Sequence, residues 1–175
     1  MSAGIGVDLR RAGESFRWGS ARIRVLHPPA PDWERPRVRN DDSVVLEVTC
    51  GDVALLLTGD ISADVERAIA PQLTHARTRI LKVGHHGSRT SSSAALLQTW
   101  RPQIALISAG RGNTFGHPTP EVLERLESIG TRIYRTDRDG EITLESDCRN
   151  AVVRTFNDEK RWPRRHEEDR RPRRK

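Results

Sequence analysis

The chain has 175 residues, which is long enough for one domain with a hydrophobic core of its own. Apolar residues make up 35% of it and charged residues 31%, and the formal net charge is +6. No apolar run approaches the about 18 residues that a transmembrane helix needs, and the start MSAGIGVDLRR lacks the apolar core of a secretory signal. We therefore expect neither a membrane span nor a signal peptide in this chain, and its compartment stays open.

The positive charge is concentrated at the C-terminal end. Residues 157–175 hold nine Lys and Arg against five Asp and Glu, so residues 1–156 are close to neutral. We expect a folded domain over 1–156, followed by a basic, disordered tail over 157–175. Non-specific contact with nucleic acid or anionic lipid is the alternative role for the tail.

The two cysteines are Cys50 and Cys148, and they do not have the spacing of a Cys-x-x-Cys pair. One widely spaced pair is not the framework of a disulfide-stapled domain, so we expect two free thiols. We find no internal repeats.

Short apolar runs alternate with amphipathic segments between residues 16 and 156. Predicted strands lie at 16–29 (one or two strands), 43–48, 53–60, 79–83, 104–108, 132–136, 140–146 and 151–156. Predicted helices lie at 62–70, 92–100 and 119–130, with Ser62 and Thr119 as N-caps, Pro120 at the first helical position and Gly130 after the end. A hairpin turn is expected at 49–52, and another turn at 139–140. Strands that alternate with helices predict an α/β layered fold with crossover connections.

Three predicted loops, each after a strand, carry polar residues suited to chemistry: 58–60, 85–88 and 113–118. If the strands run parallel, these loops meet at one edge of the sheet and bring Asp60, His85, His86 and His117 together. Each residue also has an ordinary interpretation. Asp60 could cap the following helix, and a single histidine is more often a hydrogen-bonded surface or core residue than a ligand.

The adjacent pair His85-His86 is harder to explain as ordinary structure. Neighbouring side chains diverge, so we expect one histidine to bind a metal and the other to handle protons or a substrate oxygen. The hydroxyls of Ser88, Thr90 and Ser91 precede a helix, where they could either contact a phosphate or cap the helix. Aspartate and histidine suit Zn²⁺ or Mn²⁺, but two protein ligands make an incomplete site.

The segments NDDSVVLEV, LLLTGDI, LKVGHHGSRTSSS, ALISAGRGNTFGHPTPEVLERL and YRTDRDGEITL occur in this order. Together they resemble the C-terminal domain of ComEC competence proteins, which are bacterial DNA-uptake channels in the plasma membrane, over roughly residues 20–146. The resemblance implies a metallo-β-lactamase fold, an αββα sandwich with a metal site at the edge of its two sheets. It also implies metal-dependent hydrolysis of phosphodiester bonds in DNA during DNA uptake.

The roles of the family's site residues can be assigned only to those positions of this sequence that match the family's motifs. Asp60 matches the metal-bridging aspartate and His86 a metal-binding histidine. His85 and His117 match residues with catalytic or substrate-contacting roles, although the division of labour between His85 and His86 stays open. Contacts with the substrate phosphate are expected from Ser88, Arg89, Thr90 and Asn113.

The family's HxHxDH-type motif has no counterpart here, because His27 is the single histidine in residues 1–42. We therefore expect a partial sandwich, the C-terminal half of the fold, with one apolar sheet face uncovered. The first candidate function is a metal-dependent nuclease. The alternative is a truncated, inactive interaction lobe or remnant, which needs a partner chain carrying the missing half and the membrane channel.

Overall fold

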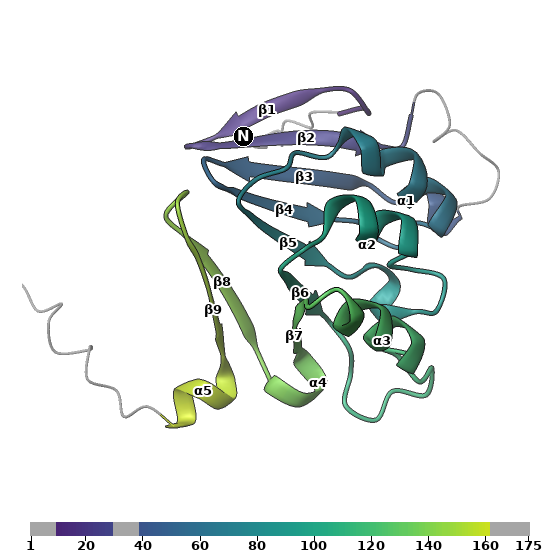
Figure 1. The fold of residues 1–175 in the computed structure, drawn as a ribbon, viewed down its shortest axis with the longest axis vertical. Coiled ribbons are helices and arrows are strands. Elements are labelled where there is room, and N and C mark those ends of the chain that lie inside the picture. The colour runs from purple at the N-terminus through teal and green to yellow at the C-terminus, as the bar shows by residue number, and fades with distance from the viewer. Residues whose placement is uncertain (1–9, 30–38, 162–175) are drawn as a thin grey trace, which may run out of the picture.

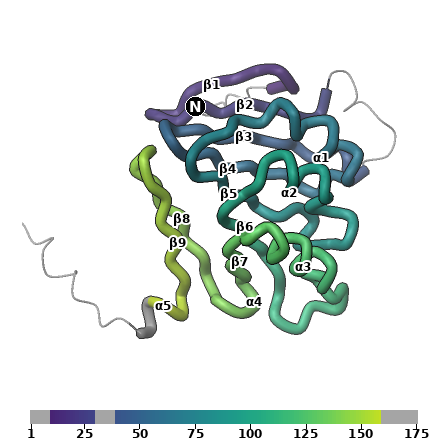
Figure 2. Tube along the Cα trace, in the orientation of Figure 1, coloured from purple at the N-terminus to yellow at the C-terminus, as the bar shows by residue number. Residues whose placement is uncertain are grey.

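The computed structural model describes residues 10–29 and 39–161 (Figures 1 and 2). One sheet contains, in chain order, β1 (Ser15–Trp18), β2 (Ala21–His27), β3 (Val45–Cys50), β4 (Val53–Leu57), β5 (Thr78–Lys82), β6 (Ile104–Ile107) and β7 (Arg132–Arg135). A separate hairpin is formed by β8 (Ile142–Ser146) and β9 (Ala151–Thr155). The helices are α1 (Ala63–Ile69), α2 (Ala94–Trp100), α3 (Pro120–Ser128), α4 (Thr136–Asp139) and α5 (Phe156–Arg161), with short 3₁₀ segments η1 (Asn40–Asp42), η2 (Ala70–Gln72) and η3 (Gly84–Gly87).

The seven-stranded sheet is mixed. Strands β1 to β4 pair antiparallel and β4 to β7 pair parallel, and the crossover helices α1, α2 and α3 lie on one face of the sheet (Figure 1). This confirms the predicted α/β fold. The register pairs Leu57 with Lys82 and Lys82 with Leu106, so the carboxyl ends of β4, β5 and β6 lie side by side.

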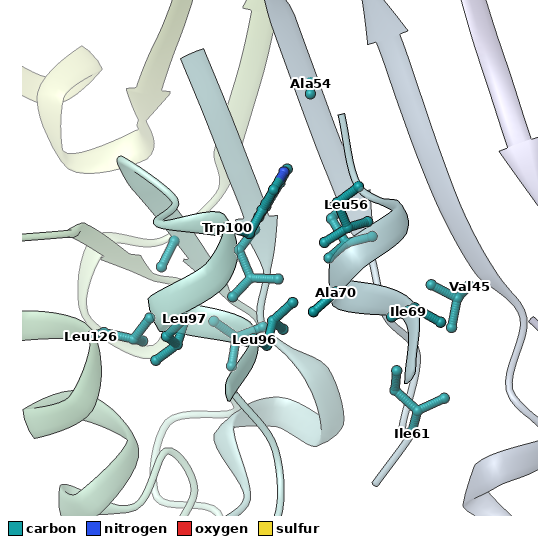
Figure 3. Close-up of a cluster of buried hydrophobic side chains, with 14 of the residues drawn as sticks. Val45, Ala54, Leu56, Ile61, Ile69, Ala70, Leu96, Leu97, Trp100 and Leu126 are labelled. Carbon is teal, nitrogen blue, oxygen red and sulfur yellow. The ribbon is translucent and has the colours of Figure 1, made fainter. Parts of the chain in front are cut away.

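The hydrophobic core lies between the sheet and these three helices (Figure 3). Trp100 at the end of α2 is fully buried, and its indole Nε1–H donates a hydrogen bond of 2.9 Å to the carbonyl of Thr74, so its polar edge is satisfied. Burial of each large side chain contributes about 1.5–3 kcal/mol, which fixes the helices against the sheet. Around Trp100 the core includes Leu56, Ile61, Leu81, Leu96, Leu97, Ile107 and Leu126.

The opposite face of the sheet is also apolar. On β3 and β4, Leu46, Val48, Leu55 and Leu57 form cross-strand pairs on this face and are only half-buried. Within the described residues, this face is therefore less completely covered than the face that packs against the helices.

The prediction of two free thiols is wrong. Cys50 and Cys148 form a disulfide, with their Cα atoms 4.7 Å apart. The bond joins the β3–β4 turn to the β8–β9 turn, and the amide of Asp52 donates to the carbonyl of Cys148 at 2.7 Å beside it. A Cβ atom at Gly51 would clash with the Cys148 backbone, so glycine permits this approach. The pairing depends on tertiary contacts across 98 residues, which spacing along the chain does not reveal.

The C-terminal end differs in detail from the prediction. The turn expected at 139–140 is preceded by the short helix α4. Gly140 is the C-cap of this helix and has φ of 77°. The domain boundary expected after residue 156 falls inside α5, where Thr155 and Asp158 share a hydrogen bond of 2.7 Å. Residues 162–175, the rest of the predicted tail, lie outside the described residues. No helix among residues 10–29 and 39–161 has the length and apolar character to cross a membrane.

Candidate functional site

The three loops predicted to meet do lie together, beyond the carboxyl ends of β4, β5 and β6. The amide of His85 in the second loop donates to the carbonyl of Gly59 in the first, at 3.1 Å. The amide of Thr119, after the third loop, donates to the carbonyl of Gly87 in the second, at 2.9 Å. The parallel strands thus deliver Asp60, the histidine pair and the His117 loop to one edge of the sheet.

Two glycines make this close approach possible. A Cβ atom at Gly84 would lie 2.9 Å from the hydroxyl of Thr58 and 3.0 Å from the carbonyl of Gly59. Gly87 has φ of +87°, and a Cβ atom there would press on Pro118. Both glycines of the GHHG segment are therefore required by the packing of the loops.

The two histidines between these glycines have left-handed backbones, with φ of 46° at His85 and 55° at His86. Non-glycine residues pay about 1–3 kcal/mol each for this region, and such strain gathers at functional sites. The side chain of His86 is exposed, and its Nδ1 lies 2.7 Å from the carbonyl oxygen of Ser108. Because a carbonyl only accepts, Nδ1 carries the proton and donates it. In the neutral ring, Nε2 is then the nitrogen that keeps a lone pair.

His117 joins the histidine pair through its ring. The rings of His85 and His117 meet edge to face, with 5.8 Å between their centroids. The ring of Phe115 lies nearly parallel to that of His117, with 6.1 Å between their centroids and 22° between their planes. Among the described residues, the buried Nδ1 of His117 has no hydrogen-bond partner. A shallow hollow of about 270 Å³ is lined by the rings of His86, Phe115 and His117 together with Asn113.

Asn113 organises the loop around this hollow. Its amide nitrogen donates to the carbonyls of Gly110 and His117, at 3.0 and 2.7 Å, and its amide oxygen accepts from the amide of His117 at 3.0 Å. The side chain is thus engaged within its own loop. A contact between Asn113 and a substrate phosphate stays a prediction.

Asp60 does not cap the helix that follows it. The start of α1 is held by Asp41, whose carboxylate accepts from the amide of Ser62 at 2.6 Å and from its hydroxyl at 3.1 Å. No hydrogen bond to the Asp60 carboxylate is found within residues 10–29 and 39–161. The half-buried Lys82 lies near it: burial lowers the pKa of this lysine, while the charge of Asp60 opposes that shift.

The hydroxyl-rich segment after the histidines divides into two parts. Helix α2 is capped by Ser93, whose hydroxyl accepts from the amide of Leu96 at 3.3 Å, and not by Ser88, Thr90 or Ser91. Ser88 and Thr90 instead share a hydrogen bond of 3.2 Å with each other, while Arg89 is exposed. Phosphate binding by these three residues stays a prediction.

Two residues that the sequence analysis did not single out hold this segment in place. Glu66 on α1 is fully buried, and its carboxylate accepts from the amides of Ser92 and Ser93 at 2.7 and 2.6 Å. Arg125 on α3 donates to the carbonyls of Arg89, Ser91 and Ser92 at 3.0, 2.9 and 3.1 Å. The supporting roles of Glu66 and Arg125 could not be predicted from the sequence, because each has the pattern of an ordinary charged residue on an amphipathic helix.

A third supporting residue is Thr136, which follows β7. Its hydroxyl accepts from the amide of Ala109 and donates to the carbonyl of the same residue, both at 2.8 Å. This fixes the chain next to Ser108, whose carbonyl orients His86. Threonine in the segment YRTDRDG therefore supports the site from the neighbouring strand.

The donor types at this edge suit Zn²⁺ or Mn²⁺, since Asp60 and His86 offer a carboxylate and an imidazole nitrogen. Their number does not suffice. No group of three or more His, Cys, Asp or Glu within the described part of the chain is arranged to hold a metal ion. These residues alone do not fit a complete catalytic metal centre.

No family model matches the chain. ComE operon protein 3 of Bacillus subtilis (strain 168) is 34% identical to it over 149 residues, which is 85% of this chain and 19% of that protein. Competence protein ComA of Neisseria gonorrhoeae is 34% identical over 74% of this chain and 18% of its own length, and Recombination protein 2 of Haemophilus influenzae is 36% identical over 76% and 16%. The chain spans less than one fifth of each of these relatives. At this identity over most of its length, the chain belongs to the family of ComEC-type competence proteins.

Proposed function

We propose that this chain takes part in DNA uptake and contributes part of a site that cleaves phosphodiester bonds. The likeness to the relatives named Competence protein ComA and ComE operon protein 3 supports the first half of this proposal. The second half rests on the residues gathered at the carboxyl ends of β4 to β6. Of these, the hydrogen bond from His86 Nδ1 to the carbonyl of Ser108 carries the argument.

That hydrogen bond gives His86 the form that metal-binding histidines take. Such histidines donate one ring N–H to a carbonyl or carboxylate, which turns the other nitrogen toward the ion. We assign Nε2 of the exposed His86 and the carboxylate of Asp60, which accepts no hydrogen bond within the described residues, as the ligands that this chain supplies to a Zn²⁺ or Mn²⁺ ion. Since the described residues gather fewer than three ligands, the remaining ones come from outside them.

The chain's own residues have roles beside that ion. His85 and His117 lie ring against ring and are placed to hold or move a proton at their ring nitrogens. The exposed Arg89, with the hydroxyls of Ser88 and Thr90, offers a cation and hydrogen-bond donors to a phosphate oxygen.

The shortage of ligands favours a second candidate function. In that case the chain binds DNA or a partner segment but cuts nothing until another segment completes the metal site. Both candidates require Asp60 and His86 to bind metal, and they differ only in whether this chain alone turns over a phosphodiester.

Calorimetric titration with Mn²⁺ and Zn²⁺ tests the shared part. We expect Asp60→Ala and His86→Ala to weaken binding about tenfold or more, and His85→Ala to spare it. His75→Ala, at an exposed position outside the site, is the matched control. Unchanged binding in both Asp60→Ala and His86→Ala would rule out the ligand assignment. Cleavage of a single-stranded oligonucleotide by the wild-type chain, lost in His85→Ala, then separates the enzyme from the inactive lobe.

A further inference from the structure

Phe115 is exposed to an unusual degree for a phenylalanine. Its side chain is 80% exposed, although it lines the same hollow as His86 and His117. Leaving this ring in water forgoes the stabilisation that burial of a phenylalanine gives a folded protein. An exposed aromatic ring at the rim of such a hollow indicates a binding surface for a ligand that covers the ring.

The loop holds this ring in a fixed place. Asn113 ties both ends of the segment 110–117 together through its three hydrogen bonds, so Phe115 stands on a closed turn. The ring of His117 lies nearly parallel to Phe115, at 6.1 Å and 22°. One side of Phe115 therefore faces another ring, and its exposure leaves the other side open to a flat partner.

The neighbouring groups indicate which flat partner fits. The loops that meet at this edge of the sheet carry imidazoles, the hydroxyls of Ser88 and Thr90 and the guanidinium of Arg89, which are groups that contact phosphate. A ligand that joins an anionic phosphate to a planar aromatic face is a nucleotide. In a duplex the bases stack on one another and hide their faces, so an open aromatic ring favours an unpaired base.

We propose that Phe115 is a stacking platform for an unpaired nucleobase of a single-stranded nucleic acid whose phosphate lies at the histidine site. This proposal rests on the proposed function, because it takes the bound phosphate to belong to a phosphodiester. It adds a positioning residue that reads the base without sequence preference, since every base has a π-face.

Fluorescence anisotropy with a short labelled single-stranded oligonucleotide tests the proposal. Stacking of one base is worth about 1–3 kcal/mol by alanine substitution, so we expect Phe115→Ala to weaken binding about 5- to 150-fold. Phe115→Trp should restore wild-type affinity, because it keeps an aromatic face. An oligonucleotide of the same length without bases should bind wild type and Phe115→Ala equally, and a blunt duplex should be insensitive to the substitution.

Trp18→Ala is the matched control, since Trp18 is also 80% exposed but lies on β1, at the far edge of the sheet from the parallel strands. Three outcomes would each overturn the platform. Trp18→Ala could weaken DNA binding as much as Phe115→Ala does, or Phe115→Ala could weaken binding of the strand without bases as much as that of the normal strand. The third outcome is wild-type affinity in Phe115→Ala. If that unchanged DNA affinity came with a change of oligomeric state, the ring would be a protein contact. Metal titration is independent of this readout, so failure of the platform and failure of the ligand assignment are distinguishable.

Discussion

Glu66 and Arg125 hold opposite polar groups of the same short segment, residues 89–93. The carboxylate of Glu66 accepts two of its amides, and the guanidinium of Arg125 donates to three of its carbonyls. The two side chains come from α1 and α3, which lie on either side of α2 in the chain. Together they fix the backbone of the segment that includes Arg89 and Thr90 and directly follows Ser88. The geometry of the site therefore depends on two side chains from outside its loops.

Arg125→Met should destabilise the fold by about 2–3 kcal/mol, because it removes charged donors from three carbonyls, and hydrogen bonds to charged groups are worth about 1.5–3 kcal/mol each but are not additive. Urea unfolding followed by circular dichroism measures this change. Arg67→Met is the control: its ion pair with Asp64 is exposed, so we expect a loss below about 0.5 kcal/mol. Equal losses in the two variants would show that Arg125 is an ordinary surface residue.

The buried carboxyl of Glu66 makes stability depend on pH. Burial raises the pKa of Glu66 above its ordinary value of 4.5, against the lowering effect of the Ser93 and Ser92 hydrogen bonds and of Arg125. The folded state therefore keeps this proton where the unfolded chain has released it, and stability falls as pH rises from 4.5 through the folded-state pKa. Glu66→Gln abolishes this proton uptake, so its stability relative to wild type should improve as pH rises.

Urea unfolding of wild type and Glu66→Gln between about pH 4.5 and pH 7.5 measures this difference. Glu127→Gln, at an exposed position on α3, is the matched control. A constant difference for Glu66→Gln over this range would contradict the raised pKa.

The disulfide closes a loop of 98 residues between the sheet and the β8–β9 hairpin. Cross-links of such loops stabilise folded domains by about 2–5 kcal/mol, mainly by restricting the unfolded chain. Cys148→Ser should therefore lower the unfolding free energy by this amount, and reduction of the wild type should do the same. The double variant Cys50→Ser, Cys148→Ser should be no less stable than the single one. Two titratable thiols in the oxidant-treated native protein would show that the bond does not form.

The elements that the sequence predicted well are those with local signals. Pro120 begins α3 and Gly130 follows its C-cap with φ of 76°, as expected from the conformations that these residues prefer. The three site loops were also predictable, because alternation of strands and helices implies parallel strands whose ends meet. Local signals failed where a contact joins distant segments. Cys50 meets Cys148 only because two turns are packed together, and Asp41 rather than Asp60 holds the start of α1 because its carboxylate reaches the amide of Ser62 from a segment 21 residues away.

The division of roles between Asp41 and Asp60 gives a direct comparison of two nearby carboxylates. Asp41→Ala should cost about 0.5–2 kcal/mol of stability, because the amide of Ser62 at the start of α1 loses its acceptor. Asp60→Asn should cost less, since its carboxylate accepts no hydrogen bond within the described residues, but it should weaken Mn²⁺ or Zn²⁺ binding while Asp41→Ala does not. Thermal unfolding and metal titration of the two variants check both halves. If Asp60→Asn proved the more destabilising while metal binding was unchanged, Asp60 would be a structural residue, and the site at the ends of β4 to β6 would lose its carboxylate.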